Sequence, residues 1–132
     1  MATVALFPGS FDPFTKGHLD ILKRALTIFD EVVVAVGVNQ DKHGFYSTAE
    51  KKEIIAQATR GMEGVRNMTD FDAEQSTADA NRRLASDIET IIIPTAQEFS
   101  HISSSIVRDL IRHDGDTSLF MPEGVKLPEK NA

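Results

Sequence analysis

Two continuous apolar runs, with a helical pattern between them, open the chain. Residues 3–7 and the β-branched run at 32–38 have the composition of strands, and positions 19, 22, 25, 26 and 29 between them are apolar at helical spacing. Strands of the second kind are typical of a parallel sheet that is covered on both faces. The pattern therefore predicts a strand–helix–strand unit with a right-handed crossover.

The rest of the chain continues this alternation. Ser47–Glu50 has the residues of a capping box and predicts a helix that ends near Arg60. A third helix is expected over 71–85, a strand over 88–93 that Pro94 ends, and a final helix from the serines at 103–105 through Ile111. We expect an α/β fold: a Rossmann-like open parallel sheet with helices on both faces, in a single domain spanning 1–132.

Composition narrows the classes of function. The 132 residues carry a net charge of −6 and contain no cysteine. Disulfides, thiolate catalysis and cysteine-bound metals are therefore excluded, and the acidic balance argues against a nucleic-acid partner. No apolar run reaches the length of a membrane span and no signal core follows Met1, so we expect no membrane association and a cytoplasmic location.

The first candidate site is the turn between the first strand and the first helix, residues 7–18. A strand–turn–helix of this kind aims backbone N–H groups and the positive end of the helix dipole at one place, which favours a phosphate. His18 adds a donor that can carry positive charge, although a solvated histidine at a helix start is the ordinary alternative. Asp12 has the features of a turn-forming acid that caps backbone amides.

A second candidate site follows the strand expected at 88–93. Three successive serines, Ser103–Ser105, stand at the start of the last helix, where they would offer hydroxyl and N–H groups to phosphate oxygens or would simply cap the helix. In an open α/β sheet, ligands bind beyond the carboxyl ends of the strands. We therefore expect His18 and the serines to converge on one triphosphate.

Together the two turns resemble the nucleotidyltransferase superfamily, whose marks are T-x-G-H, here Thr15–His18, and I-S-S-S, here Ile102–Ser105. The resemblance is closer to the phosphopantetheine adenylyltransferase family and extends over nearly the whole chain, in order. Its further motifs are the P-G-[ST]-F-D-P-[FI]-T-x-G-H-x-D-[IV] pattern at 8–21, D-F-x-x-E at 70–74, Ala-Asn-Arg at 80–82, I-S-S-S-x-V-[KR] at 102–108 and F-x-P-E-x-V at 120–125.

The resemblance implies an activity: transfer of the adenylyl group of ATP to 4′-phosphopantetheine, which gives dephospho-coenzyme A and pyrophosphate in coenzyme A biosynthesis. The acceptor phosphate attacks the α-phosphorus in line, so the protein has only to position its substrates and neutralise charge. Family members use Mg²⁺, which arrives with ATP and needs no metal cage of protein ligands. They also assemble as homo-oligomers, commonly hexamers.

The family's site residues map onto this chain one by one. By the resemblance, His18 would stabilise the transition state, Lys42 would contact the acceptor phosphate, Ser10 would contact both substrates, and Arg108 could add charge near the β,γ-phosphates. The implied ATP contacts are Ser10, Phe11, His18, Gly64, Val65, Arg66, Glu74, Phe99, Ser100, His101, Ile102, Ser103, Ser104 and Ser105. A solvated loop lysine and an exposed helix acid are the ordinary alternatives for Lys42 and Glu74.

The chain departs from the family in one place. Between Arg60 and Gly64 it lacks about 25 residues, roughly one strand–helix–strand unit. Glu63 stands where the family's R-G-[LV]-R element has its first arginine. Either the natural chain contains this segment and the present sequence lacks it, which we favour, or the deletion is genuine and is compensated by partners or by rearrangement.

Two alternative functions therefore stay open. One is a nucleotidyltransferase with another phosphate acceptor, such as nicotinate mononucleotide or glycerol phosphate. The other is an adenine-nucleotide-binding protein without turnover, which the missing arginine favours and the intact Thr15–His18 element opposes.

Overall fold

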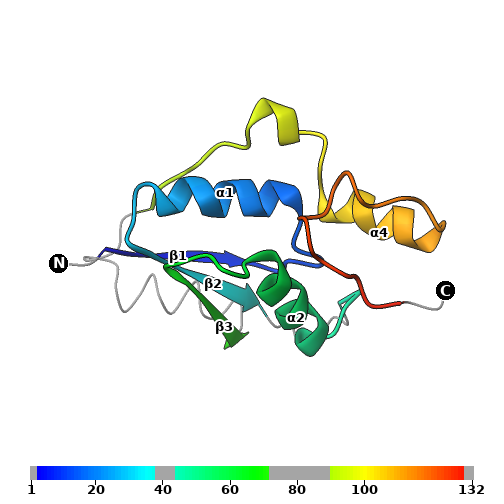
Figure 1. Cartoon of the computed structure of the whole chain (residues 1–132), viewed down its shortest axis with the longest axis horizontal. Helices are drawn as coiled ribbons and strands as arrows, with labels where there is room; N and C mark the ends of the chain where they lie inside the picture. Colours follow the sequence, from blue (N-terminus) through cyan, green and yellow to red (C-terminus); the bar gives the residue numbers. More distant parts are fainter. Residues whose placement is uncertain (1–2, 38–43, 72–89, 130–132) are drawn as a thin grey trace.

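The computed structural model describes residues 3–37, 44–71 and 90–129. Its centre is a parallel sheet of β1 (Val4–Gly9), β2 (Glu31–Gly37) and β3 (Val65–Phe71), in that spatial order (Figure 1). Helix α1 (Lys16–Leu26) connects β1 to β2. The predicted strand–helix–strand unit and the α/β class with a parallel sheet are thus confirmed.

The remaining helices are α2 (Thr48–Ala58), the short 3₁₀ helix η1 (Gln97–Phe99) and α4 (Ser104–Arg112). The predicted capping box of α2 is present, because Glu50 N–H donates to Ser47 Oγ at 3.1 Å and Ser47 N–H donates to Glu50 Oε1 at 2.9 Å. In Figure 1, α4 lies beyond the carboxyl end of β1. The fold therefore places the start of α4 beside the first turn.

The core lies on one face of the sheet. The alternate β2 residues Val32, Val34 and Val36 are buried in the same cluster as Leu22 of α1 and Ile54 of α2. Since side chains alternate along a strand, α1 and α2 cover the same face. On the opposite face of β1, the side chains of Val4 and Leu6 are exposed. Among the described helices, the predicted cover of both faces is therefore seen on one face only.

The third strand is not the one that the sequence predicted. Residues 65–71 form β3, and Val32 to Val34 of β2 pair with Val65 to Asn67. The helix expected from Phe71 cannot begin there, because Phe71 is the last residue of β3; residues 72–85 lie outside the described part. The short link at 61–64 thus leads directly from α2 into a strand.

The prediction of a strand over 88–93 is wrong for residues 90–93, the part of this range that the structure describes. Residues 90–93 are not in a strand, and the side chains of Ile91 and Ile92 are 53% and 84% exposed. This stretch instead leads over the outer side of α1 (Figure 1), where Arg24 Nη2 donates to Pro94 O at 2.7 Å. Three adjacent isoleucines favour a strand only where neighbouring strands and helices bury them.

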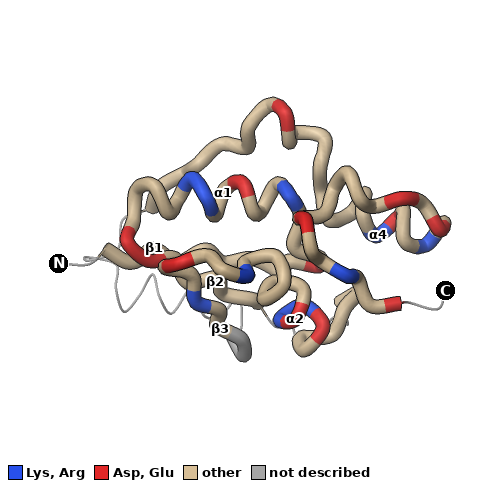
Figure 2. The backbone as a smooth tube through the Cα atoms, viewed as in Figure 1, with Lys and Arg blue, Asp and Glu red and all other residues tan. Residues whose placement is uncertain are grey.

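In the described part of the chain, positive and negative side chains are intermixed on the side that Figure 2 shows. Figure 2 shows Lys and Arg interspersed with Asp and Glu along α1 and at the end of α4, with no continuous positive stripe in this view. A nucleic-acid surface would need such a stripe. None of the described helices is long and apolar enough to cross a membrane.

Candidate functional site

The two candidate turns meet in the structure. Ser104 Oγ donates a hydrogen bond to Pro13 O at 2.8 Å, and Arg108 Nη1 donates to Asp12 O at 2.7 Å. Both donors belong to α4 and both acceptors to the turn after β1. The predicted convergence of the first turn and the serine-bearing helix is therefore confirmed by direct contact.

Asp12 secures the turn from a second direction. Its carboxylate accepts from Phe45 N at 2.7 Å and from Tyr46 N at 2.8 Å, and it is almost fully buried. The structural role predicted for Asp12, capping of backbone amides, is confirmed, although the amides belong to the segment before α2 and not to its own turn.

The middle of the turn is tightly built around Phe11. This residue has φ of 45°, in the left-handed region that side-chain-bearing residues rarely adopt, and its ring is 98% buried. A Cβ at Gly9 would lie 2.9 Å from the Phe11 ring. The glycine is thus needed to accommodate that ring.

His18 is held in a defined tautomer. Thr15 N donates to His18 Nδ1 at 3.0 Å, so Nδ1 carries no proton and the neutral ring has its hydrogen on Nε2. The ring stacks on Phe14, with centroids 5.4 Å apart, and meets the edge of Phe11 at 5.0 Å. Within the described residues, no hydrogen bond occupies Nε2.

Burial among these rings lowers the pKa of His18 from 6.5 to about 4. Removal from water disfavours the charged imidazolium, and no carboxylate offsets that loss. At neutral pH the residue is therefore a neutral N–H donor. The sequence suggested a donor that can become cationic, and the structure corrects the second half of that expectation.

The three serines differ in what their hydroxyl groups can still do. Ser104 donates its hydrogen to Pro13 O, so that hydrogen is committed. Ser103 Oγ accepts from Ile106 N at 3.2 Å and Ser105 Oγ accepts from Arg108 Nη2 at 3.0 Å. An accepting hydroxyl keeps its hydrogen, so Ser103 and Ser105 remain able to donate to a phosphate oxygen. Capping and ligand binding are thus compatible at Ser103.

The segment before α4 brings the other late candidates to the same end of the sheet. Phe99 ends η1, Ser100 Oγ donates to Gln97 O at 2.9 Å, and His101 meets the edge of the Phe120 ring at 5.9 Å. Ile102 N donates to Phe99 O at 3.0 Å and closes the turn. These residues lead directly into Ser103, and Ser100 and His101 are exposed.

The helix α1 contributes fewer free amides than the turn pattern suggested. Lys16 N donates to Phe120 O at 2.9 Å, so the first amide of α1 is occupied by the segment after α4. Ser10, at the end of β1, is exposed. Among the described residues, the exposed Ser10 and side-chain groups of His18 and the serine helix are donors that remain available.

Gly64, Val65 and Arg66 are not brought to this place. They lie where β3 begins, beside the first residues of β2, whereas the turn after β1 lies at the opposite, carboxyl end of the parallel sheet. Arg66 Nη2 pairs with Glu31 Oε2 at 2.9 Å. A strand starts here, and its length separates these residues from His18, so the structure does not bring them to the turn. Their contact with ATP phosphates stays a prediction.

Gly64 has a structural reason of its own. Its φ is 82°, and a Cβ there would lie 2.6 Å from Asp30 O. Val32 N also donates to Gly64 O at 2.7 Å. The glycine permits the tight entry into β3 next to β2.

Two predicted site residues, Lys42 and Glu74, lie outside the described residues, as does the Ala80–Arg82 element. Within the described ranges, no group of three or more His, Asp or Glu side chains could hold a metal ion. A magnesium ion that arrives on nucleotide phosphates needs no such group, so the residues present are compatible with it.

Sequence reasoning missed two contributors. The Phe120 carbonyl receives the first amide of α1, and Lys51 of α2 is buried near Asp12. A backbone carbonyl leaves no signal in a sequence. Lys51 lies one turn before the buried Ile54 and Ile55, and this spacing was the one available clue that it faces inward.

An open cavity of about 450 Å³ lies at the other end of α4. Tyr46, Ile111, Thr117 and Leu127 are among its described lining residues, and none of the predicted ATP contacts belongs to that described lining. Burial and the nearby Glu50 and Asp12 raise the pKa of Tyr46 to about 12, so its hydroxyl stays protonated. This cavity is separate from the turn that holds His18.

Comparisons with known proteins agree with this geometry. The family model of cytidylyltransferase-like proteins matches residues 6–88. Phosphopantetheine adenylyltransferase of Flavobacterium psychrophilum is 41% identical over 148 residues, with 93% of this chain and 97% of the relative covered. The enzyme of that name from Porphyromonas gingivalis is 40% identical over 149 residues, with 94% and 97% covered.

Solved structures share the fold. A bifunctional NMN adenylyltransferase/ADP ribose pyrophosphatase of Francisella tularensis, in complex with AMP and a manganese ion, superimposes with a TM-score of 0.69 at 17% identity, over 92% of this chain and 44% of that one. A putative nicotinate-nucleotide adenylyltransferase of Vibrio parahaemolyticus gives 0.59 at 14% identity, over 92% and 94%. Similarity at these identities establishes the architecture alone.

The matches with the relatives extend over more positions than the 132 residues of this chain. The relatives therefore contain internal residues that this chain lacks, as the shortened link predicted; its location between Arg60 and Gly64 stays a prediction. The identity over almost the whole length of these relatives nevertheless decides the assignment. The chain belongs to the phosphopantetheine adenylyltransferase family, within the nucleotidyltransferase superfamily.

Proposed function

We propose that this protein transfers the adenylyl group of ATP to 4′-phosphopantetheine and releases dephospho-coenzyme A and pyrophosphate. The relatives that carry this family's name support the reaction and its two substrates. The acceptor phosphate would attack the α-phosphorus directly, so no protein nucleophile is required. The protein's work is then to hold two anionic substrates in line and to stabilise the charge that develops.

One observation carries the proposal. The turn of His18 and the serine-bearing helix α4 are joined by the hydrogen bonds of Ser104 to Pro13 and of Arg108 to Asp12. These bonds hold the early and late motifs at one end of the sheet. Donors from both motifs can then act on the same triphosphate, which a nucleotidyl transfer requires.

His18 would act as a neutral hydrogen-bond donor. Thr15 N fixes Nδ1 as the acceptor, so the hydrogen stands on Nε2, the nitrogen that no described residue occupies. Such a donor would stabilise a non-bridging oxygen of the α-phosphoryl group as negative charge increases on it. Because the pKa is lowered to about 4, this role needs no protonation step at neutral pH.

The remaining contacts are assigned by the same reasoning. Ser103 and Ser105 keep hydroxyl hydrogens that could bind nucleotide phosphates, and Ser10, which follows β1 in the first turn, is exposed. We assign Lys42 to the acceptor phosphate and Glu74 to the nucleotide by family resemblance. Mg²⁺ bound to ATP would neutralise phosphate charge. A cytoplasmic location and assembly into homo-oligomers, as hexamers, belong to the same proposal.

The test is a pyrophosphate-release assay with ATP and 4′-phosphopantetheine, with dephospho-coenzyme A identified by mass spectrometry. We expect product formation that depends on both substrates and on Mg²⁺. Nicotinate mononucleotide and glycerol phosphate serve as the comparison acceptors, and turnover with either in place of phosphopantetheine would replace the proposed acceptor.

A second candidate, nucleotide binding without turnover, is favoured by one specific observation. Arg66 pairs with Glu31 at the far end of the sheet, and Glu63 occupies the place of the family's preceding arginine. The site therefore has fewer cations for phosphates than the family pattern implies. ATP binding by calorimetry together with no pyrophosphate release would select this candidate.

A further inference from the structure

Lys51 of α2 is a charged side chain to which neither the sequence motifs nor the family resemblance gives a role. It is only 8% exposed and lies on the inward side of the helix, where Ile54 and Ile55 are also buried. Lysine is rarely buried to this degree unless an opposite charge accompanies it. The burial therefore calls for a partner.

The surroundings of Gly44 show which carboxylate lies near Lys51. A Cβ at Gly44 would lie 3.2 Å from Lys51 Nζ and 3.3 Å from Asp12 Oδ2. The ammonium and the carboxylate thus face the same small space, and their separation cannot exceed the sum of these two distances. Charges that close, both mostly removed from water, attract each other appreciably.

The location of Asp12 gives this attraction a consequence for binding. Asp12 stands in the turn between Ser10 and His18, and its carboxylate accepts from the amides of Phe45 and Tyr46. These bonds hold a carboxylate directly in the turn that is proposed to receive a triphosphate. An uncompensated carboxylate there would repel the ligand.

We propose that Lys51 is a positioning residue that balances the charge of Asp12 and so makes the first turn able to bind a nucleotide triphosphate. The inference rests on the proposed function for the identity of the ligand. Lys51 acts through Asp12 and the amides of Phe45 and Tyr46. It stabilises the conformation of the turn and keeps the electrostatic potential there favourable for an anion. It takes no part in the chemical step.

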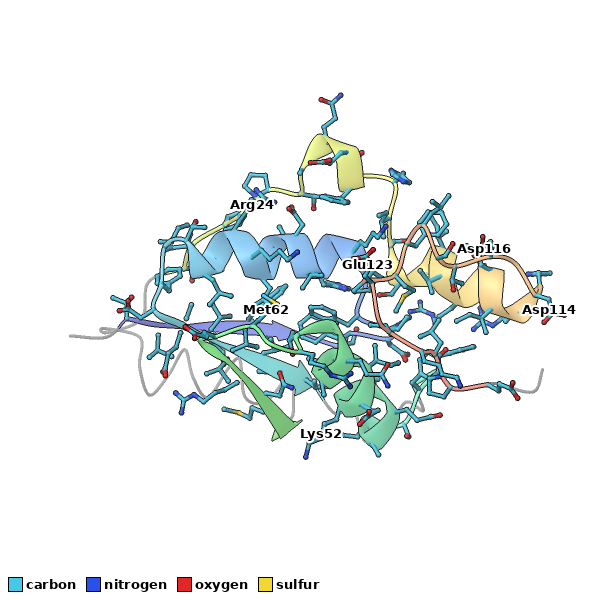
Figure 3. The ribbon with its side chains drawn as sticks, viewed as in Figure 1. Arg24, Lys52, Met62, Asp114, Asp116 and Glu123 are labelled. Atoms are coloured by element: carbon cyan, nitrogen blue, oxygen red, sulfur yellow. The ribbon has the colours of Figure 1, made fainter. Side chains whose placement is uncertain are left out.

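Lys51→Met tests the role, and the adjacent Lys52 supplies a matched control. Figure 3 shows Lys52 on α2 with its side chain extending away from the molecule, and Lys52 is exposed. We expect Lys51→Met to raise the KM for ATP about tenfold with little change in kcat, and Lys51→Arg to restore it to within about threefold. Lys52→Met should leave both constants unchanged.

Measuring the effect of Lys51→Met in the Asp12→Asn variant distinguishes charge balance from simple packing. In Asp12→Asn the carboxylate is absent, so adding Lys51→Met should weaken ATP binding by less than about threefold. Loss of packing would instead weaken binding equally in both backgrounds. Circular dichroism and thermal unfolding identify variants that fail to fold, and Lys51→Gln replaces Lys51→Met in that case.

Calorimetric titration with a non-hydrolysable ATP analogue keeps this inference apart from the proposed reaction. If the wild-type chain binds the analogue but forms no product, the reaction is refuted, while the dissociation constants of the same variants still decide the role of Lys51. The inference is overturned if Lys51→Met binds the analogue within twofold of wild type, if Lys51→Arg is as weak as Lys51→Met, or if both backgrounds respond alike.

Discussion

Motif residues at the carboxyl end of the sheet and those at its amino end differ in the segments that they contact. At the carboxyl end, the turn after β1 is bonded to α4 through Ser104 and Arg108 and to the segment before α2 through Asp12. At the amino end, the described contacts of Gly64 and Arg66 are with the start of β2 and the residue before it: Asp30, Glu31 and Val32. A motif present in the sequence can therefore lie away from the end of the sheet at which the ligand is proposed to bind.

The largest effect on catalysis should come from His18, whose ring is fixed by Thr15 N and packs against Phe14 and Phe11. His18→Gln removes the fixed Nε2 donor, and we expect kcat to fall by about 10²–10³-fold, the usual consequence of losing one donor to a developing oxyanion. The assay is pyrophosphate release at saturating ATP. His113 is exposed at the end of α4, and within the described residues its ring bonds only to Asp109 O, so His113→Gln is the control and should retain full activity.

The same histidine should make stability depend on pH. Its pKa is about 4 when folded and 6.5 in the unfolded chain, so the unfolded state binds more protons between these values. Stability contributed by the neutral ring is therefore complete above pH 6.5 and is lost as the pH falls toward 4. We expect His18 to cost at most about 3 kcal/mol of unfolding free energy over this interval.

Urea unfolding at pH 7, 5.5 and 4.5 measures this dependence. Carboxylates titrate in the same range, so the quantity that matters is the difference between wild type and His18→Gln at each pH. Equal slopes for the two proteins would mean that His18 is not buried as described.

At the amino end of the sheet, replacing a glycine should lower the stability of the fold without acting directly on catalysis. Gly64→Ala places a methyl group 2.6 Å from Asp30 O, and we expect a loss of about 2–4 kcal/mol in unfolding free energy. Gly61 has a similar φ of 78° and nothing within 4 Å of its Cβ position, so Gly61→Ala should cost only about 1 kcal/mol. Similar losses in the two variants would contradict the close approach to Asp30.

The smallest expected effect comes from Arg66→Ala, which tests most directly whether the amino end of the sheet contributes to nucleotide binding. Arg66→Ala should leave the KM for ATP unchanged and should lower stability by less than about 1 kcal/mol, since its ion pair with Glu31 is exposed. A rise in KM of tenfold or more would place Arg66 at the nucleotide after all. The steady-state assay that tests His18 measures it.

The sequence predicted the parts of the fold that depend on local pattern. The alternation of apolar runs located β1, α1 and β2, and the Ser47–Glu50 capping box located the start of α2. It also predicted the meeting of the first turn with Ser104, because parallel strands bring successive carboxyl-end turns to one edge.

The sequence misled about the third strand. Residues 90–93 have the composition of a buried strand, but no strand in the described part of the chain buries them, and Ile92 stays largely exposed. Residues 65–71 contain Arg, Asn, Thr and Asp and lack a strong strand pattern, yet they pair with β2. Strand identity there is decided by which segment the chain can deliver to the sheet, a property that no local window records.

The neutral tautomer of His18 and the burial of Lys51 were also out of reach of the sequence. The tautomer depends on Thr15 N, and the neutral state depends on the burial of the imidazole among three phenylalanine rings of the same short segment. The burial of Lys51 near Asp12 is a property of packing between segments distant in sequence.

Asp12 joins two layers through different atoms, since its carboxylate receives the amides of Phe45 and Tyr46 while its carbonyl receives Arg108. Those two amide protons therefore report on the conformation of the turn. Their nuclear magnetic resonance shifts and solvent-exchange rates would register any loosening or tightening of the turn, with no label attached to the ligand.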